Sequence, residues 1–345
     1  MIDISIDMLS LGNADSITVW LKDENNNSFV ILIDGGNKSQ GTDVIKHLDK
    51  HILPATGKKA PDLIICTHHD KDHIGGLIIV VEHYKNLIPE IWVNNPAEHI
   101  SSYRYQTLKE SFKKKSAEKQ YEVIMESLQN VDDFITLVDK FNIPRQPALY
   151  GQSKFNGKIK ILGPSDGFYK SLLPGMDNVE QYVSQEAKYA HNSLFPNQNP
   201  DLLLEGVSPC PIVDAENSTS ATNNSSVILE ITARENKRFL FTGDAGVQAF
   251  EDVEIHDSLN NLFWMQVPHH GSRRNLSSKL IDKMSPKWAL ISAKGGKENK
   301  HPRLALVNCL KKHGAKVNST HKGGSKWHHI GNFPPRDGYS TAAEI

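Results

Sequence analysis

The sequence predicts a layered α/β fold, and three observations lead to this prediction. Roughly the first 90 residues alternate short apolar stretches with helical patterns, as strands and helices do in such folds. The 345 residues include 38% hydrophobic and 23% charged side chains, which is the composition of a globular protein with a sizeable core. In both halves of the chain, strand-like stretches end in histidine or aspartate. Functional sites of α/β folds lie at such strand ends.

Charge and apolar patterning exclude several classes of protein. The 39 basic and 40 acidic side chains give a net charge of −1, so nucleic-acid binding would need a local basic patch. Apolar runs such as 29–33 and 77–81 are much shorter than the about 20 residues that cross a bilayer, so no membrane contact is expected. The first residues alternate apolar and polar side chains, which predicts a strand instead of a signal peptide and a cytoplasmic protein.

The cysteines give no sign of a disulfide-rich protein. Cys66, Cys210 and Cys309 are an odd number at wide spacing. This pattern indicates neither a disulfide framework nor a zinc knuckle, and it fits a reducing compartment.

The elements of the N-terminal half follow from apolar periodicity. Strands are predicted over 2–11, 16–22, 28–33, 62–67 and 158–162, and a helix over 43–51. The charged segment 103–141 predicts helices, and its lysine-rich stretch 109–119 is ordinarily a solvated helix face. We therefore expect one domain over 1–345 with a helical insertion near 96–150. A loop-rich insertion near 165–222 is indicated by its many Asn, Ser and Pro residues.

Regular structure resumes in the C-terminal part. The stretches 226–232 and 238–242 predict two antiparallel strands joined by a polar turn. Further strands are predicted over 264–267 and 288–291. A helix is expected over 303–313, with Gly314 at its C-terminal end.

The strongest functional signal follows the apolar run 63–66. It reads Thr67-His68-His69-Asp70-Lys71-Asp72-His73-Ile74-Gly75-Gly76. His68 and Asp70 are two residues apart on an extended chain and share a side, whereas Asp72 and His73 enter a turn and can face a second point. This geometry suits two adjacent metal ions. The alternative is a polar turn that caps the next helix, but so many neighbouring ionisable groups would then repel or need costly partners.

Three further stretches place ligand-type residues directly after a strand. They are Asp34-Gly35-Gly36 after 29–33, Thr242-Gly243-Asp244 after 239–241, and Pro268-His269-His270-Gly271-Ser272 after 265–267. Each alone is a weak signal, because Asp-Gly-Gly is usually a turn. Their order along one chain is what favours a common site.

In this order the motifs resemble those of the metallo-β-lactamase superfamily, and most closely the nuclease-like domain of the ComEC/Rec2 competence proteins. That branch typically has His-Pro-Asp-x-Asp-His-Ile-Gly-Gly, which residues 68–76 match except for His69 in place of proline. Its Leu-Leu-Thr-Gly-Asp resembles residues 240–244, and its Val-Pro-His-His-Gly-Ser is intact at 267–272. A later His-Pro resembles His301-Pro302. The resemblance covers most of residues 1–320.

The resemblance implies a four-layer αββα sandwich of two mixed sheets with two metal ions at one edge. The implied ligands are His68 and Asp70 for one ion, Asp72 and His73 for the other, Asp244 as a bridge, and His270, or as a second choice His269, to complete the second site. Asp34 would orient the ligands by accepting hydrogen bonds. Where the superfamily normally has a further histidine, this chain has Asn223-Asn224-Ser225-Ser226. The first ion is thus a ligand short unless water, substrate, Asn224, Ser226 or His191 fills the place.

The implied ligands are rich in carboxylate and contain no cysteine, which suits Zn²⁺ or Mn²⁺. Two such ions can lower the pKa of a bridging water toward about 7 and clamp a displacement at phosphorus. The sequence therefore predicts a metal-dependent hydrolase, a phosphodiesterase or nuclease that uses a metal-bridging hydroxide. Asp72 and His301 would be its catalytic residues, with His301 as proton donor, and nucleic acid or a nucleotide its substrate.

Two alternatives remain open at this stage. One is a hydrolase of carboxyl esters, thioesters or lactones, because the same scaffold supports these reactions in relatives. The other is a non-catalytic binding module whose loops are stabilised by metal, with the helical segment 103–141 as the surface for a protein partner.

Overall fold

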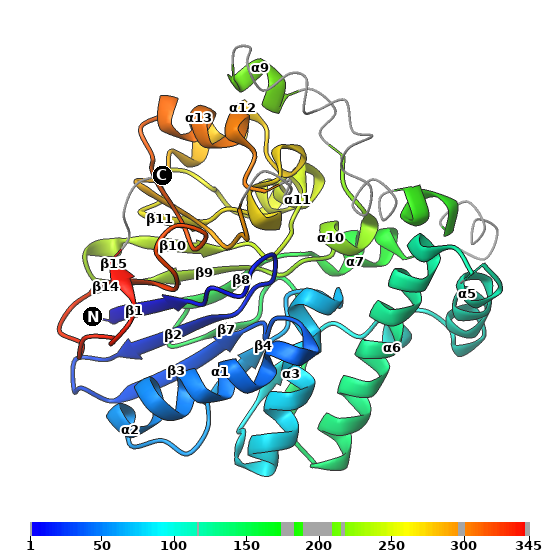
Figure 1. Ribbon diagram of the computed structural model, residues 1–345, viewed down its shortest axis with the longest axis horizontal. Coiled ribbons are helices and arrows are strands. Elements are labelled where there is room, and N and C mark those ends of the chain that lie inside the picture. Colours follow the sequence, from blue (N-terminus) through cyan, green and yellow to red (C-terminus); the bar gives the residue numbers. More distant parts are fainter. Residues whose placement is uncertain are drawn as a thin grey trace.

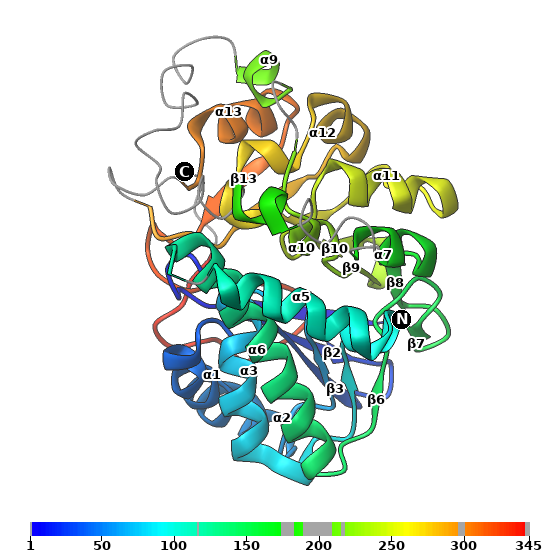
Figure 2. The ribbon, with the colours of Figure 1, turned by 90° about the vertical axis from the view of Figure 1, so that its right-hand side faces the viewer.

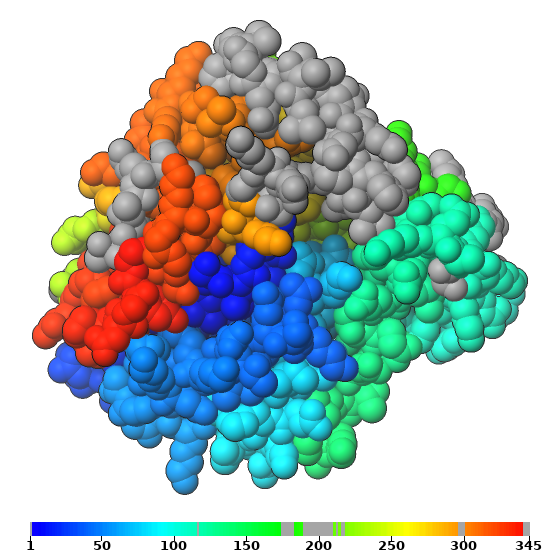
Figure 3. Space-filling model, in the orientation of Figure 1, coloured from blue at the N-terminus to red at the C-terminus, as the bar shows by residue number. Residues whose placement is uncertain are grey.

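The computed structural model describes residues 2–115, 117–173, 183–188, 209–214, 218–295 and 301–341. In this part of the chain two mixed β-sheets pack face to face, and helices cover the outer side of each sheet (Figures 1 and 2). The predicted αββα sandwich is confirmed. The C-terminal strands lie beside the N-terminal ones on one face of the molecule (Figure 3), because β14 pairs with β1.

The first sheet has the strand order β15-β14-β1-β2-β3-β4-β5-β6. Its strands are β1 (Asp3–Met8), β2 (Ile17–Lys22), β3 (Ser28–Ile33), β4 (Leu63–Ile65), β5 (Ile91–Trp92), β6 (Arg145–Gln146), β14 (Lys326–Ile330) and β15 (Ser340–Thr341). The pairs from β3 to β6 are parallel, and those from β14 to β3 are antiparallel. Parallel strands covered on both faces need apolar side chains at every position, which explains the unbroken apolar sequences at the end of β3 and in β4.

The second sheet has the order β13-β12-β11-β10-β9-β8-β7. Its strands are β7 (Ser153–Lys154), β8 (Ile159–Gly163), β9 (Ile228–Thr232), β10 (Arg238–Phe241), β11 (Trp264–Gln266), β12 (Trp288–Ile291) and β13 (Lys316–Ser319). The strands β10 to β13 run parallel, whereas β7 to β10 pair antiparallel. The hairpin predicted from the polar turn is thus the β9–β10 pair.

The helices pack in two outer layers. They are α1 (Gly41–His47), α2 (Leu53–Thr56), α3 (Lys71–Tyr84), α4 (Pro96–His99), α5 (Ser102–Lys114), α6 (Lys119–Lys140), α7 (Asp166–Leu172), α9 (Pro209–Val213), α10 (Ala221–Asn224), α11 (Val247–His256), α12 (Ser278–Met284) and α13 (Leu304–Lys312). Side chains of α1, α3 and α6 share an apolar cluster on the first sheet. Those of α9, α11, α12 and α13 form another on the second sheet.

The core between the sheets is aromatic and aliphatic. Phe241 and Trp264 are fully buried there, and their ring centroids lie 5.0 Å apart. Rings of this size contribute much of the apolar area that stabilises a fold. The strand ends that carry the predicted ligands are therefore fixed to a rigid support.

The helical segment 102–140 forms a two-helix projection beside the first sheet (Figures 1 and 2). Val131, Phe134 and Val138 recur at helical spacing and pack with α3, so α6 belongs to the outer layer. Tyr105 and Phe112 of α5 pack on α6 in a separate small cluster. The chain then returns to the sheet as β6.

The expectation for the cysteines was wrong. Cys210 of α9 and Cys309 of α13 form a disulfide, while Cys66 is free and buried. The partners are 99 residues apart in sequence, and spacing alone cannot indicate a pairing over that distance. The loop-rich insertion expected near 165–222 lies largely outside the described residues, and so does His191. Among the helices of the described part, none is both long and apolar enough to span a membrane.

Candidate metal centre

Four strand ends from the two sheets supply the candidate site. Asp34 follows β3, and the segment with His68 and Asp70 follows β4 in the first sheet. Asp244 follows β10, and His269 and His270 follow β11 in the second sheet. Neighbouring parallel strands end at the same edge of a sheet, so the fold itself brings these distant segments together.

Asp34 organises the ligands of the first sheet. Its buried carboxylate accepts hydrogen bonds from the Thr67 amide at 2.8 Å, the Thr67 hydroxyl at 2.7 Å and His73 Nδ1 at 2.8 Å. Because Nδ1 of His73 donates its proton to Asp34, Nε2 is the ring nitrogen of His73 that is left to bind a metal. Asp34 has a left-handed backbone with φ of 58°, a conformation that aspartate adopts more readily than most residues. Its predicted role in orienting ligands agrees with these contacts.

The Thr67 hydroxyl fixes the orientation of His68. It gives its proton to Asp34, and can therefore accept a hydrogen bond from Nδ1 of His68 at 3.1 Å. The Nε2 atom of His68 is then the one with a lone pair. The centroids of the His68 and His73 rings lie 4.1 Å apart, so the two Nε2 atoms are close enough to bind a common ion.

Glycines allow the first turn of α3 to approach the end of β3. A Cβ on Gly76 would lie 1.8 Å from the carbonyl oxygen of Gly35, and one on Gly75 would lie 2.7 Å from a backbone nitrogen. The two segments are joined by hydrogen bonds from Gly76 N to the Gly36 carbonyl and from Gly35 N to the His73 carbonyl. Only glycine permits this contact, and the contact is what places His73 beside Asp34.

Asp244 enters the site from the second sheet. Its amide donates to Ser226 Oγ at 3.1 Å, and its carbonyl accepts a hydrogen bond from the Asn275 side chain at 2.8 Å. The carboxylate is directed at the histidines: Oδ1 lies 3.3 Å from His73 Nε2, and Oδ2 lies 3.9 Å from His68 Nε2. Ser226, one of the less certain sequence candidates, is placed by the structure behind the backbone of Asp244.

Three of these ligand-type atoms lack a hydrogen-bond partner within the described chain. They are His68 Nε2, His73 Nε2 and Asp244 Oδ1, all buried. They belong to a group whose ligand atoms lie within 4.8 Å of one another. Imidazole nitrogens and a carboxylate oxygen that converge in a buried site need a bound cation between them, either a proton or a metal ion. The residues therefore fit a divalent metal ion.

A second group shares His73 with the first. Asp72, His73 and His270 also offer ligand atoms within 4.8 Å of one another. His270 has a left-handed backbone, and its Nδ1 donates to the Ser292 carbonyl at 3.0 Å. Its Nε2 thus faces Asp72 Oδ2 at 3.2 Å. The described chain therefore holds two adjacent donor groups that meet at His73.

The electrostatics of the site favour bound positive charge. Burial alone would lower the pKa of His73, but the Asp244 and Asp34 carboxylates raise that pKa well above its ordinary value. Burial would raise the pKa of Asp244, yet the neighbouring histidines hold it well below its ordinary value. Asp72 is half-buried, and its contact with His270 lowers its pKa to about 2. The carboxylates consequently remain ionised and available as ligands at neutral pH.

The remaining sequence candidates surround these two groups. Asp70 Oδ2 lies 3.7 Å from His68 Nε2, and Asp70 Oδ1 accepts a hydrogen bond from Ser127 of α6 at 3.2 Å. His269 Nε2 lies 3.8 Å from Asp244 Oδ2, on the same side as His68. The ring of His301 is centred 5.4 Å from the His269 ring, outside both donor groups.

Asn224 lies against α11 in the structure. Its amide nitrogen donates to the side chain of Gln248 at 3.3 Å. Its neighbour Asn223 instead reaches His269, with its amide nitrogen 3.2 Å from Nδ1 of that ring. The polar segment in place of the family histidine thus supports His269 and Asp244 through Asn223 and Ser226.

Sequence reasoning missed Asp15 and Gln266. Gln266 of β11 donates to Asp15 Oδ2 at 2.6 Å and accepts from the Thr242 amide at 3.1 Å, so it links the N-terminal loop to the segment before Asp244. Asp15 Oδ1 lies 3.5 Å from His270 Nδ1. The available signals were weak: one acidic residue between two predicted strands, and one polar residue ending an apolar strand.

Comparison with known proteins finds three similarities. A family model for the metallo-β-lactamase superfamily matches residues 12–125. Over 96% of its length the chain is 23% identical to ComE operon protein 3 of Bacillus subtilis (strain 168), and it spans about a third of that relative, 34% of its length. The long form RNase Z from yeast is similar over 88% of this chain and 39% of its own, with a TM-score of 0.42 and 12% identity. The family match over about a third of the chain, the similarity to ComE operon protein 3 and the two mixed sheets agree with the resemblance to the metallo-β-lactamase superfamily.

Proposed function

We propose that this protein is a metal-dependent phosphodiesterase that acts on a nucleic acid or a nucleotide. The observation that carries the proposal is the pair of adjacent donor groups, His68–His73–Asp244 and Asp72–His73–His270. Two neighbouring cation sites are the arrangement that phosphatases and nucleases use for displacement at phosphorus. The many carboxylates in and around the groups support Zn²⁺ or Mn²⁺ as the ions.

The contacts support a division of the ligands between two ions. His68 and Asp70 would hold the first ion, with Asp244 between the two. Asp72, His73 and His270 would hold the second. His269 is well placed to supply the first-side ligand that the family pattern has and this chain lacks, because its Nε2 and that of His68 approach the same oxygen of Asp244.

Bound divalent ions would supply two things: a water molecule of lowered pKa and positive charge against a phosphate. The residues of the chain hold and orient the ligands for this chemistry. Asp34 keeps the proton of His73 on Nδ1, and the Ser292 carbonyl keeps the proton of His270 on Nδ1. His301 stands beside His269 without belonging to either donor group, which suits the transfer of a proton to a departing oxygen.

The positive charge near helices α5 and α6 is only partly available to bind a nucleic acid. Lys109 is paired with Asp132, and Lys71 with Glu126 at 3.1 Å, so part of the positive charge there is already neutralised. The proposal of a phosphodiester substrate therefore depends on the two metal-ligand groups and not on these lysines. Cytoplasmic localisation and a protein partner at 103–141 stay predictions.

The proposal is tested on protein stripped with a chelator and reloaded with Zn²⁺ or Mn²⁺. We expect turnover of a bis-aryl phosphodiester and of DNA, RNA or a cyclic nucleotide, and its loss in Asp72→Ala and His270→Ala together with loss of metal. His83→Ala, at the other end of the same helix as Asp72, is the control and should behave like the unaltered protein. Hydrolysis of a thioester in place of phosphodiesters would overturn the substrate class. Tight metal binding without turnover of any of these substrates would instead favour the binding module.

A further inference from the structure

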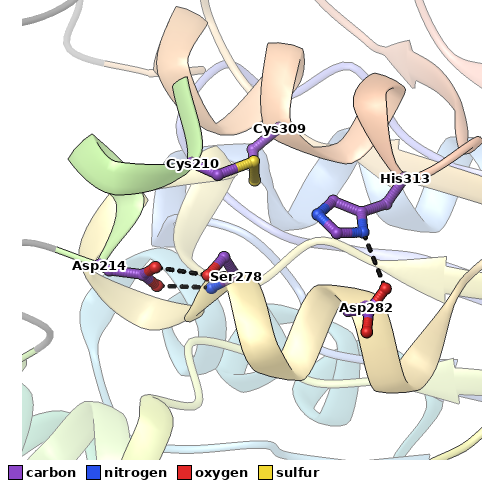
Figure 4. The surroundings of a disulfide bond; sticks show 6 residues. All are labelled: Cys210, Asp214, Ser278, Asp282, Cys309 and His313. Atoms are coloured by element: carbon purple, nitrogen blue, oxygen red, sulfur yellow. Dashed lines mark hydrogen bonds and ion pairs between the residues drawn. A yellow bond between two sulfur atoms is a disulfide. The ribbon is translucent and has the colours of Figure 1, made fainter. Parts of the chain in front are cut away.

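A second cluster of metal-ligand side chains lies outside both donor groups described above. Cys210 comes from α9 and Cys309 from α13, and His313 directly follows the last residue of α13 (Figure 4). One ligand atom from each lies within 4.8 Å of the others. Cys210 and Cys309 are buried, whereas the His313 side chain is 23% exposed, so solvent reaches one side of the cluster.

His313 is oriented as a ligand would be. Its Nδ1 contacts the Asp282 carboxylate of α12 at 3.1 Å, and its other ring nitrogen is turned toward the two sulfurs (Figure 4). A carboxylate that holds one nitrogen of an imidazole fixes the proton there and leaves the second nitrogen free to bind a metal. The position of Cys309 four residues before His313 puts both side chains on one face of α13.

We propose that Cys210, Cys309 and His313 bind one Zn²⁺ ion when the disulfide is reduced. Two thiolates and an imidazole are soft ligands that select zinc over Mn²⁺ or Mg²⁺. In tetrahedral zinc sites with bonds of about 2.3 Å to sulfur, the two sulfurs lie about 3.8 Å apart, so they must separate from the about 2.05 Å of a disulfide. Water would take the fourth position on the exposed side of His313. This inference does not depend on the proposed hydrolytic function.

The two states of the cluster exclude each other. Reduction by a dithiol transfers two electrons and two protons to the sulfurs, gives two thiols and turns the reductant into its own disulfide. Zinc binding then replaces both thiol protons, which pass to solvent. Re-oxidation requires that the metal leave, because the two sulfur atoms that bind the metal are the ones that form the disulfide bond. The cluster is thus a zinc site in reducing conditions and a covalent cross-link in oxidising ones.

The surroundings hold α9 in place without the disulfide. Val213 is fully buried in the apolar cluster on the second sheet. Asp214 accepts a hydrogen bond from the Ser278 amide at 2.6 Å and another from the Ser278 hydroxyl, at the start of α12 (Figure 4). Cys210 therefore remains beside α13 after reduction, and little ordering is needed to bind the ion.

Cobalt titration distinguishes this site from the candidate centre at the strand ends, because only thiolate ligands give a sulfur-to-cobalt charge-transfer band in the near ultraviolet. The protein is reduced with a water-soluble phosphine, freed of metal and titrated with Co²⁺, and Zn²⁺ is then added to displace the cobalt. We expect the band in reduced protein, its absence in oxidised protein, and its loss in Cys309→Ser and Cys210→Ser. Cys66→Ala, which removes the free cysteine, should keep the band.

Two further variants test the role of the histidine. Asp282→Asn should weaken Zn²⁺ binding by about 10–100-fold, and His313→Ala by more than that. Reduced protein without the band would overturn the proposal, and this comparison needs no substitution that could disturb folding. A His313→Ala protein that binds Co²⁺ as tightly as the unaltered protein would overturn the assignment of the third ligand.

Discussion

Replacement of Asp34 by asparagine tests how the candidate centre is held together. Asparagine tolerates the left-handed backbone at this position, so the loop should keep its shape. Its remaining oxygen can still accept from the Thr67 amide. Its NH₂ group, however, replaces the oxygen that accepts hydrogen bonds from both the Thr67 hydroxyl at 2.7 Å and His73 Nδ1 at 2.8 Å.

The expected effect falls on His73. To accept a hydrogen bond from the new NH₂ group, Nδ1 of His73 must lose its proton, which then occupies Nε2. That atom faces Asp244 and is the one that would bind a metal. Changes to the groups that orient metal-binding histidines typically cost 10–100-fold in affinity, which corresponds to about 1.4–2.7 kcal/mol.

The assay is competition for Zn²⁺ between the protein and a chelating dye. Asp252→Asn is the matched control, because Asp252 is a buried aspartate that accepts two hydrogen bonds of 2.7 Å from Ser165 away from the candidate centre. The control should lose stability but keep its metal affinity. If Asp34→Asn binds zinc as tightly as the unaltered protein, or if the control loses affinity equally, the proposed control of the His73 proton is wrong.

Four other substitutions have definite expected outcomes. His301→Ala should slow phosphodiester turnover with an unchanged metal content by elemental analysis; loss of metal would make His301 a ligand. Gly76→Ala should abolish metal retention, because its Cβ would meet the Gly35 carbonyl, whereas the exposed Gly167→Ala should not. Phe134→Ala should lower the free energy of unfolding in urea by about 3–5 kcal/mol, as expected for a fully buried ring, and a loss under 1 kcal/mol would mean that α6 packs loosely. Burial, with His51 and Arg336 nearby, lowers the pKa of His47 to about 3, so the unfolded chain binds a proton that the folded chain excludes. The contribution of His47 to the free energy of unfolding should therefore fall as the pH drops below about 6.5, so the unaltered protein should lose more stability toward acid than His47→Gln; equal pH profiles would contradict this.

The sequence predicted the layered fold because it depends on local patterns, and the same patterns pointed to the candidate site. Unbroken apolar runs such as 63–66 marked buried strands, and ligand-type residues after them marked the strand ends. Asp15 and Gln266 carried no such pattern, since their role arises only when the N-terminal loop meets the end of β11. The disulfide was mispredicted for a similar reason: α9 and α13 become neighbours only through packing on the second sheet.

The contact between Gly35 and Gly76 makes two stretches of sequence behave as one part. Asp34-Gly35-Gly36 supplies the carboxylate, His73 to Gly76 supplies the ring that it orients, and backbone hydrogen bonds join the two segments. A designer who transplanted the histidine motif alone into another scaffold would obtain a helix start with a freely rotating imidazole. Because of this contact, we expect the two motifs to occur together in related sequences. The pair should therefore identify this kind of centre more reliably than either motif by itself.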